Sequence, residues 1–498
     1  MKLGPIILKN GLTDLGSGDL RRTDLLINDG KVQDISAGIE VPDVEKIDCT
    51  SFLIVPGMIN SHYHSNGNFD RGLWDNLPLE PYGVFAFPRL MTPKLSSREL
   101  YIRTLIGGLE QVRSGVTCTI DFLFDPELFS PDSLGPVVKA YRDLGLRVVV
   151  VLGMNDRPYH ETVLLDVNRV DRDLLELMNR EKPPSWSRWE AAARGAIKMF
   201  HRPDEGVSIG LAPGAPERCT DELLSGCARL SEELNVIVQT HALETRMQSV
   251  IARERFGKTL PEHLRDLNFL SPRLSLQHGI WLTEADCELI AQSGAVVVHN
   301  PISNMKLGSG ICPVPLMQRH GVDLALGTDA MSCNDNCNMQ ESLKIAALLH
   351  KLWDLDFEQW SGAREAWRMA TRGGARSAGD PERLGRIGPG SWADLLLLDL
   401  RSHGFSPLNE SIDQFVLGAP YGCIDSVMVQ GQWIVRNRIV QRVDEEPILE
   451  EAREIGRDLQ GRRKAAWAVA DRLVQAVSEG WREARRRYSG PARLMELH

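Results

Sequence analysis

Eight short apolar runs, separated by stretches of helical periodicity, fill the middle of the 498-residue chain and constrain its fold more than any other feature. The runs are Ile54–His64, Thr117–Phe122, Arg147–Leu152, Val207–Pro213, Val236–Ala242, Leu274–Gly279, Ala295–Asn300 and Val322–Asp329. This alternation is typical of parallel βα units, and eight units fit an α/β fold, the (β/α)8 TIM-like barrel, with its active site at the strand C-termini. A doubly wound open sheet is the alternative, but no glycine-rich phosphate loop follows the first run.

The two ends of the chain contain shorter strand-like segments. Asn28–Gly30 is a strong hairpin signal, and apolar runs recur late in the chain at Ala393–Asp399 and Ser426–Val435. We expect the two ends to meet in one sheet structure, and two separate hairpins are the alternative. The predicted units are a composite β-sandwich (1–55 and 381–440), the barrel (56–380) and a helical C-terminal extension (441–498).

Charge and composition exclude some classes of partner. The net charge of −10 leaves no basic excess to neutralise phosphates, which argues against a nucleic-acid partner. No stretch reaches the ~18 consecutive apolar residues of a membrane span. Nine cysteines without regular spacing are typical of reduced thiols, so we expect a cytoplasmic protein.

Polar residues with metal-binding side chains stand at the C-terminal ends of five of the eight runs. They are His62 and His64 on the first run, His241 on the fifth, His278 on the sixth, His299 on the seventh and Asp329 on the eighth. Side chains two apart on a strand share a face, so both imidazoles of the H-x-H pair can reach one ion. Independent core histidines have no reason to favour strand ends. Three imidazoles and a carboxylate are typical of a catalytic divalent metal site that keeps one position open.

Five segments together carry a resemblance to a known family. They are Pro56–His64, Thr240–Thr245, Leu276–Gly279, His299–Gly308 and Leu326–Asp329. With them the chain resembles the amidohydrolase superfamily, in particular its cytosine-deaminase-like and triazine-hydrolase-like aminohydrolases. The resemblance implies that the metal ligands are His62, His64, His241 and Asp329. It also implies that Glu244 shuttles protons and that His278 contacts the attacking water or the substrate.

These residue types suit hydrolytic deamination of a small heterocyclic amine or amidine. A bound divalent ion, Zn²⁺ first and Fe²⁺ second, brings the pKa of its water down to ~7 and makes hydroxide available. Asp329 can accept the water proton, Glu244 can protonate a ring nitrogen, and His278 can stabilise a developing oxyanion. Hydrolysis of an exocyclic amide, carbamate or halide at the same metal is an alternative, and a non-enzymatic scaffold is an alternative of another class.

Binuclear members of the superfamily bridge two metals with a modified lysine on the fourth strand. The fourth run here, Val207–Pro213, contains no lysine, so we expect one metal per chain. We also expect a homodimer or homotetramer.

The substrate is constrained by the loop Ser65–Glu80, which is placed to cover the site and is similar to a loop of methylthioadenosine and adenosylhomocysteine deaminases. Those enzymes carry a histidine where this chain has Gly214, and no counterpart of their ribose-binding carboxylate is evident at Phe87–Leu90. A compact aminated heterocycle is therefore favoured over a nucleoside. The candidate substrate-binding residues are Asn68, Trp74, His160, His299 and Asn304.

Overall fold

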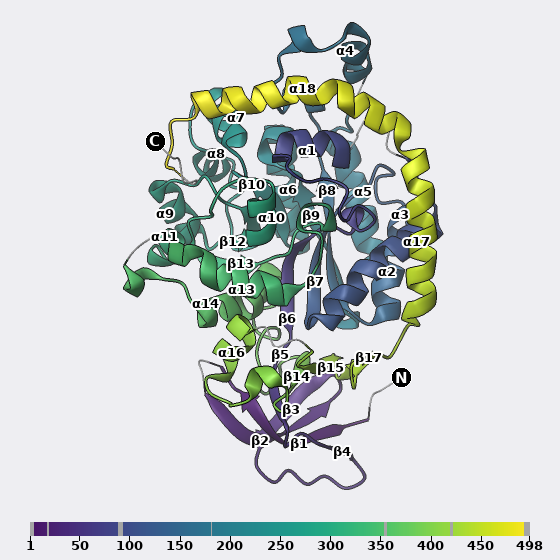
Figure 1. Cartoon of the computed structure of the whole chain (residues 1–498), viewed down its shortest axis with the longest axis vertical. Coiled ribbons are helices and arrows are strands. Elements are labelled where there is room, and N and C mark those ends of the chain that lie inside the picture. The colour runs from purple at the N-terminus through teal and green to yellow at the C-terminus, as the bar shows by residue number, and fades with distance from the viewer. Residues whose placement is uncertain are drawn as a thin grey trace.

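The structure is a computed structural model that describes residues 4–16, 19–87, 93–180, 182–352, 356–418 and 422–492. Two sheets organise it. An eight-stranded parallel sheet forms the barrel, and a nine-stranded sheet built from both ends of the chain lies at one end of it (Figure 1). The Phe87–Leu90 segment, where no ribose-binding carboxylate was evident, lies mostly outside the described residues.

The barrel contains the eight predicted strands. They are β6 (Met58–Tyr63), β7 (Val116–Phe124), β8 (Arg147–Met154), β9 (Val207–Pro213), β10 (Val238–Ala242), β11 (Leu274–His278), β12 (Val296–His299) and β13 (Asp323–Leu326). Neighbours pair in parallel in sequence order from β6 to β13. The two outer strands approach each other where the Asp329 N–H donates to the His62 carbonyl at 2.9 Å. The predicted (β/α)8 barrel is therefore confirmed.

The first predicted strand, Ile54–His64, is in fact two strands that belong to different sheets. β5 (Phe52–Pro56) joins the nine-stranded sheet, where Ile54 pairs with Leu397, and β6 begins the barrel. The chain changes sheets at Gly57, where a β-carbon would lie only 2.1 Å from Thr117 Oγ1. Only glycine allows this close approach, so the break has a steric cause that an apolar run does not reveal.

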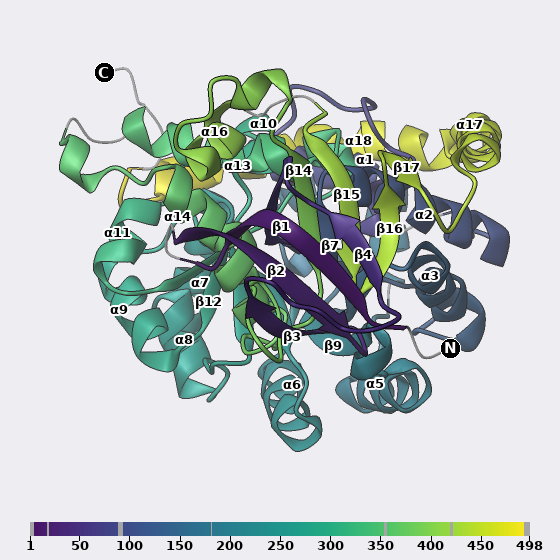
Figure 2. The ribbon, with the colours of Figure 1, turned by 90° about the horizontal axis from the view of Figure 1, so that it is seen from below.

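The nine-stranded sheet brings the two ends of the chain together (Figure 2). Its strands, besides β5, are β1 (Ile6–Asp14), β2 (Leu20–Asn28), β3 (Lys31–Ser36), β4 (Glu45–Asp48), β14 (Leu395–Asp399), β15 (Ile424–Val429), β16 (Gln432–Arg436) and β17 (Ile439–Val440). The antiparallel β5–β14 pair joins the N-terminal strands to the C-terminal strands. A buried ion pair, Arg147 Nε to Asp394 Oδ2 at 2.9 Å, connects this sheet to the barrel.

Helices surround the barrel and connect its strands. The α-helices before the C-terminal extension are α1 (Leu79–Ala86), α2 (Ser97–Arg113), α3 (Pro131–Leu144), α4 (Arg172–Asn179), α5 (Trp186–Phe200), α6 (Asp221–Leu234), α7 (Arg246–Phe256), α8 (Leu260–Asp266), α9 (Glu284–Ser293), α10 (Pro301–Lys306), α11 (Val314–Arg319), α12 (Met331–Asn334), α13 (Met339–Leu349), α14 (Ala363–Arg368), α15 (Gly374–Ser377) and α16 (Ser411–Gly418). Local sequence fixes several helix starts. Ser96 and Glu99 form a capping box at α2, for example, which satisfies two otherwise unpaired N–H groups.

The C-terminal extension forms two long helices, α17 (Glu445–Arg462) and α18 (Lys464–Arg487), that wrap around the barrel (Figure 1). α18 packs against α1 and α4 through an apolar cluster that includes Val84, Leu174 and Leu473. Among the described residues, no helix is both long and apolar enough to cross a membrane.

Candidate metal centre

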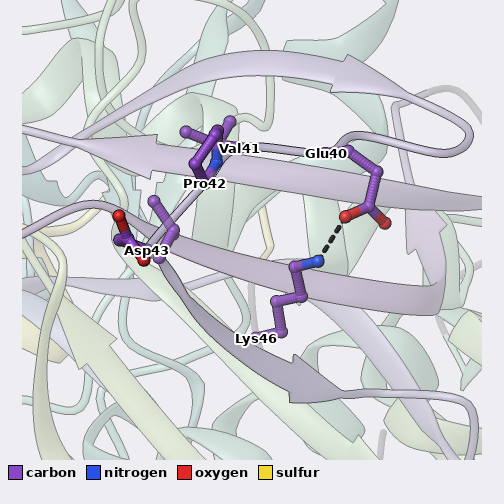
Figure 3. A pocket seen from close by; sticks show the side chains of 6 residues that line it. Glu40, Val41, Pro42, Asp43 and Lys46 are labelled. Carbon is purple, nitrogen blue, oxygen red and sulfur yellow. Dashed lines mark hydrogen bonds and ion pairs between the residues drawn. The ribbon is translucent and has the colours of Figure 1, made fainter.

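A cavity of about 710 Å³ opens where the barrel strands end. Its wall includes the ends of β6, β7, β10 and β11, the helices α1 and α2, and residues of α17 and the α17–α18 junction. Polar side chains that line it include His64, Asn155, His241, Glu244, His278 and Asp329. A second hollow lies far from these residues, in the exposed loop between β3 and β4, where Lys46 forms an ion pair with Glu40 (Figure 3).

The structure brings the four predicted metal ligands together. His64 Nε2 lies 3.2 Å from His241 Nε2. Asp329 Oδ1 lies 3.7 Å from His62 Nε2 and 3.6 Å from His64 Nε2. Donor atoms at such separations can bind one ion in common, and His62, His64 and Asp329 form one group that could do so.

Hydrogen bonds on the far side of two rings orient their donor atoms. Nδ1 of His64 lies 2.7 Å from the Phe122 carbonyl, and Nδ1 of His241 lies 2.6 Å from the Gly214 carbonyl. A carbonyl only accepts, so each Nδ1 carries the proton and each Nε2 directs a lone pair toward the other. Two facing lone pairs at 3.2 Å favour a cation between them.

Burial keeps the imidazoles in the neutral form that binds metals. Burial, followed by the charge of neighbouring imidazoles, holds the pKa of His62 and His241 well below the usual histidine value. Both ring nitrogens of His62 are buried and lack a hydrogen-bond partner among the described residues. Because buried polar atoms are rarely left unsatisfied, this residue set fits a bound divalent ion.

Asp329 and His278 are held by unusual backbone at the ends of β13 and β11. Their φ angles are +65° and +69°, in the left-handed region that non-glycine residues seldom occupy. Such conformations persist where the surrounding structure requires them, and they cluster at functional sites. Here they place Asp329 Oδ2 at 3.8 Å from His278 Nε2.

Glu244 lies next to this group as a buried acid. Its Oε2 is 3.6 Å from His278 Nε2. Burial, helped by the nearby Asp329 carboxylate, raises the pKa of Glu244 well above the usual glutamic acid value. A raised pKa favours the protonated form of a carboxyl group, which suits it to deliver a proton to a substrate.

The five predicted substrate-binding residues occupy different environments. Of the five, only Trp74 lines the cavity. The Asn68 amide instead donates to Tyr63 Oη at 2.5 Å and to the Arg103 carbonyl at 2.7 Å, which commits it to holding the loop after β6. His160, in the short 3-10 turn Tyr159–Glu161, is outside the cavity lining.

The other two candidates lie behind the site. His299 Nε2 is 3.3 Å from His350 Nε2, so its ring is turned into a buried histidine pair. Asn304 Oδ1 is 2.8 Å from His278 Nδ1, which gives Asn304 an orienting position and not a place in the cavity wall. His299 is the last residue of β12, but its position at a strand end did not reveal the direction of its side chain.

Asn155 is a cavity residue that the sequence analysis missed. Asn155 directly follows β8 and lines the cavity, and its buried Oδ1 lacks a hydrogen-bond partner among the described residues. A β-carbon at Gly214 would lie 2.2 Å from Asn155 Oδ1, so the glycine makes room for this amide. The signal was present in the sequence, because Asn155 is a polar residue at a strand C-terminus like the metal ligands.

Comparison with known proteins agrees with this geometry. Residues 53–434 match the model of the amidohydrolase family. The chain belongs to the amidohydrolase family. Among its relatives, a 5-methylthioadenosine/S-adenosylhomocysteine deaminase of Pyrococcus furiosus is 31% identical over 89% of this chain and 98% of its own length.

Solved structures of other amidohydrolases have the same fold. An adenosine deaminase from Xanthomonas campestris with bound zinc matches with a TM-score of 0.80 and 25% identity over 91% of this chain and 98% of its own. Atrazine chlorohydrolase from Arthrobacter aurescens, complexed with zinc, matches with a TM-score of 0.81 and 22% identity over 91% and 100%. The family, its zinc-bound members and the ligand group of this chain together identify a divalent metal site in an amidohydrolase.

Proposed function

We propose that this amidohydrolase is a deaminase that hydrolyses the exocyclic C–N bond of a compact aminated heterocycle with one bound Zn²⁺. The observation that carries the proposal is that Glu244, a buried carboxyl group with a raised pKa, lies beside the cluster of His62, His64, His241 and Asp329. Zinc is preferred over iron because three imidazoles and one carboxylate suit Zn²⁺ and because zinc is bound in the similar structures.

His62, His64, His241 and Asp329 would hold the metal. When bound, the metal lowers the pKa of a water molecule and thereby supplies the nucleophile at neutral pH. Water oxygen bonds to the ring carbon and the C–N bond breaks. Of the two water protons, one remains on a ring nitrogen and one leaves with the amine as ammonia.

The residues of the chain move these protons. Glu244 delivers its proton to the ring nitrogen, and Asp329 takes up a water proton that must reach the leaving amine. His278 lies between them, 3.6 Å from Glu244 Oε2 and 3.8 Å from Asp329 Oδ2. Nδ1 of His278 donates a hydrogen bond to Asn304, so Nε2 of the neutral ring carries a lone pair. Nε2 can donate a hydrogen bond to the substrate oxygen only after it has taken up a proton.

The substrate class is inferred from the wall beside β8 and β9. Gly214 leaves space that the Asn155 amide fills, and an amide offers both a donor and an acceptor to a ring edge. We infer a free heterocycle, such as an aminated pteridine, purine, pyrimidine or triazine. Adenosine-type nucleosides are the second candidate, because the relatives are named for them.

A substrate screen tests the proposal. Zinc-loaded protein is incubated with aminated heterocycles and with adenosine, methylthioadenosine and adenosylhomocysteine, and ammonia release is measured. We expect turnover of at least one compact heterocycle and slow turnover of the nucleosides. A kcat/KM of ~10⁵ M⁻¹s⁻¹ for one of the nucleosides would show that a nucleoside, and not a free heterocycle, is the substrate. Release of chloride or an alkylamine without ammonia would instead favour the alternative leaving groups.

Location and assembly are further parts of the proposal. We infer a cytoplasmic protein, because nine cysteines without regular spacing are typical of reduced thiols. We also infer a homodimer or homotetramer, which light scattering on the purified protein would detect. We also propose the unit boundaries predicted from the sequence, which are 1–55 and 381–440 for the composite sheet unit, 56–380 for the barrel and 441–498 for the C-terminal extension.

A further inference from the structure

An arginine without an acidic partner among the described residues lines the same cavity as the metal ligands. Arg103 lies on the inward face of α2 and is 5% exposed. The same cavity is also lined by Leu100 of α2, by Ser133 and Val137 of α3, and by Asp125 after β7. None of these residues has a part in the deamination steps above.

No described residue serves as a counter-ion for the Arg103 guanidinium. In the part of the chain that the structure describes, its Nε is buried without a hydrogen-bond partner and no carboxylate oxygen lies within 4.0 Å of it. Arg463, which lines the same cavity, shows the contrast because it forms an ion pair with Asp70. Arg147, the other arginine with its whole side chain buried among the described residues, is likewise paired, with Asp394 at 2.9 Å.

The acidic residues whose charges act on Arg103, which are Asp70, Asp121 and Asp125, are engaged by other donors, and Asp70 pairs with Arg463. Asp121 accepts from the Ser65 N–H and from Tyr141 Oη, each at 2.9 Å. Asp125 Oδ2 accepts from the Phe129 N–H at 2.7 Å. These carboxylates act on Arg103 only from a distance, so they partly offset its charge without occupying its donors.

An unpaired buried charge is expensive, and evolution seldom keeps one without a use. Burial lowers the pKa of the Arg103 guanidinium, yet a guanidinium stays protonated under all ordinary conditions. Its planar fork of N–H donors matches the two oxygens of a carboxylate. A cavity of about 710 Å³ has room for a heterocycle and an acidic substituent together.

We propose that Arg103 is an anion subsite, and that the substrate is an aminated heterocycle carrying a carboxylate. The inference rests on the proposed deamination for the ring, but the subsite itself is a binding property that can be measured without turnover. Arg103 thereby determines specificity: the carboxylate docks against the α2–α3 wall, while the amine-bearing carbon faces the metal ligands.

Binding of deamination products tests the subsite, because products bind without reacting. Two matched pairs serve as probes: lumazine with lumazine-6-carboxylate, and uracil with orotate. Dissociation constants are measured by calorimetry for the zinc-loaded protein and for Arg103→Met, Arg103→Lys and Arg98→Met. Arg98 lies on the same helix but is exposed and paired with Glu451, so it is the matched control.

We expect the wild-type protein to bind at least one carboxylate about 10-fold or more tightly than its neutral partner. Arg103→Met should remove that preference, Arg103→Lys should keep part of it, and Arg98→Met should leave it unchanged. Absence of a carboxylate preference in both pairs, or a preference that survives Arg103→Met, would overturn the inference.

Thermal unfolding separates a binding role from a structural one. Methionine keeps the apolar stem and removes an unpaired charge, so Arg103→Met should unfold at the same temperature as the wild type or higher. A large fall in Tm would show that Arg103 stabilises the fold and would overturn the subsite. If ammonia release fails for every heterocycle while the Arg103-dependent preference persists, the deamination proposal falls and the anion subsite stands.

Discussion

The Nε2 atoms of His64 and His241 face each other at 3.2 Å while the Nδ1 of each ring contacts a main-chain carbonyl. The carbonyls of Phe122 and Gly214 thus determine the tautomer of both rings. This relationship joins β6 to β10 across the barrel mouth and makes the pair a ready ligand set for one cation.

Glu244→Gln should keep the metal and lose most of the turnover. Glutamine has nearly the same shape, so the ligand group is undisturbed, but it cannot deliver the proton that a carboxyl with a raised pKa holds. The expected fall in kcat is ~10²–10⁴-fold, measured by ammonia release with metal content as the control. A rate close to that of the wild type would remove Glu244 from the mechanism.

Asn304→Ala should slow the reaction without releasing the metal. Asn304 accepts the Nδ1 proton of His278 at 2.8 Å, and without it the ring loses its fixed tautomer and orientation. We expect kcat to fall by about 10–100-fold, as for other residues that orient a site from behind. Asn336→Ala is the control because Asn336 is in an exposed hydrogen bond with Glu341. Equal rates for the two variants would contradict the orienting role.

Arg463→Met should destabilise the C-terminal extension at the cavity wall. Arg463 lies at the α17–α18 junction and forms an ion pair with the buried Asp70 in the loop after β6. Removing one partner leaves a buried charge uncompensated, which costs about 3–5 kcal/mol in the free energy of unfolding.

Two further variants test whether the uncompensated charge of Asp70 causes the loss of stability. Arg462→Met, at the adjacent residue, breaks a more exposed pair with Glu99 and should cost only about 0–1 kcal/mol. Adding Asp70→Asn to Arg463→Met should recover most of the loss. Denaturant titration of all three variants decides this, and no recovery in the double variant would show that packing, not charge, is responsible.

Asp24 should make the nine-stranded sheet sensitive to acid. Burial opposes ionisation of Asp24, but hydrogen bonds from Lys9 Nζ at 2.7 Å, the Asn10 N–H at 2.8 Å and the Ile39 N–H at 2.9 Å outweigh burial and lower its pKa. A folded-state pKa below the unfolded value of about 3.9 stabilises the fold above that pH. This stabilisation disappears as the pH falls through the folded-state pKa.

Comparison with Asp24→Asn isolates this contribution. The variant should be about 1–3 kcal/mol less stable than the wild type at pH 7, since asparagine keeps the shape but loses the charge-assisted bonds. The difference should shrink below about pH 4. A difference in unfolding free energy that stays constant from pH 7 to pH 3 would contradict the ionised-state explanation.

The sequence predicted the barrel because each strand of this fold is a separate apolar run whose C-terminus faces the same side. For the same reason it predicted which residues meet at the mouth, and His62, His64, His241 and Asp329 do lie together. Their roles as ligands remain a prediction. Gly57 shows the limit, since the chain changes sheets there through a steric approach to Thr117 that lies 60 residues away in the sequence.

Side-chain direction was harder to predict than strand position. His299 and His278 both end barrel strands, yet His299 turns to His350 while His278 turns into the cavity. The partners that decide this come from other parts of the chain, such as Asn304 for His278. The missing counter-ion of Arg103 is likewise a property of the packed structure, because helix α2 alone does not show what faces it.

Metal content of the purified protein tests the central claim most directly. Elemental analysis of the wild type, His241→Ala and His320→Ala is compared with ammonia release from the same samples. His320 is the control because it lies on the surface beside Glu284, away from the ligand group. We predict one zinc per chain for the wild type and for His320→Ala, and loss of both metal and activity for His241→Ala. Two metals per chain that are both needed for activity, or full activity of His241→Ala without metal, would contradict the account.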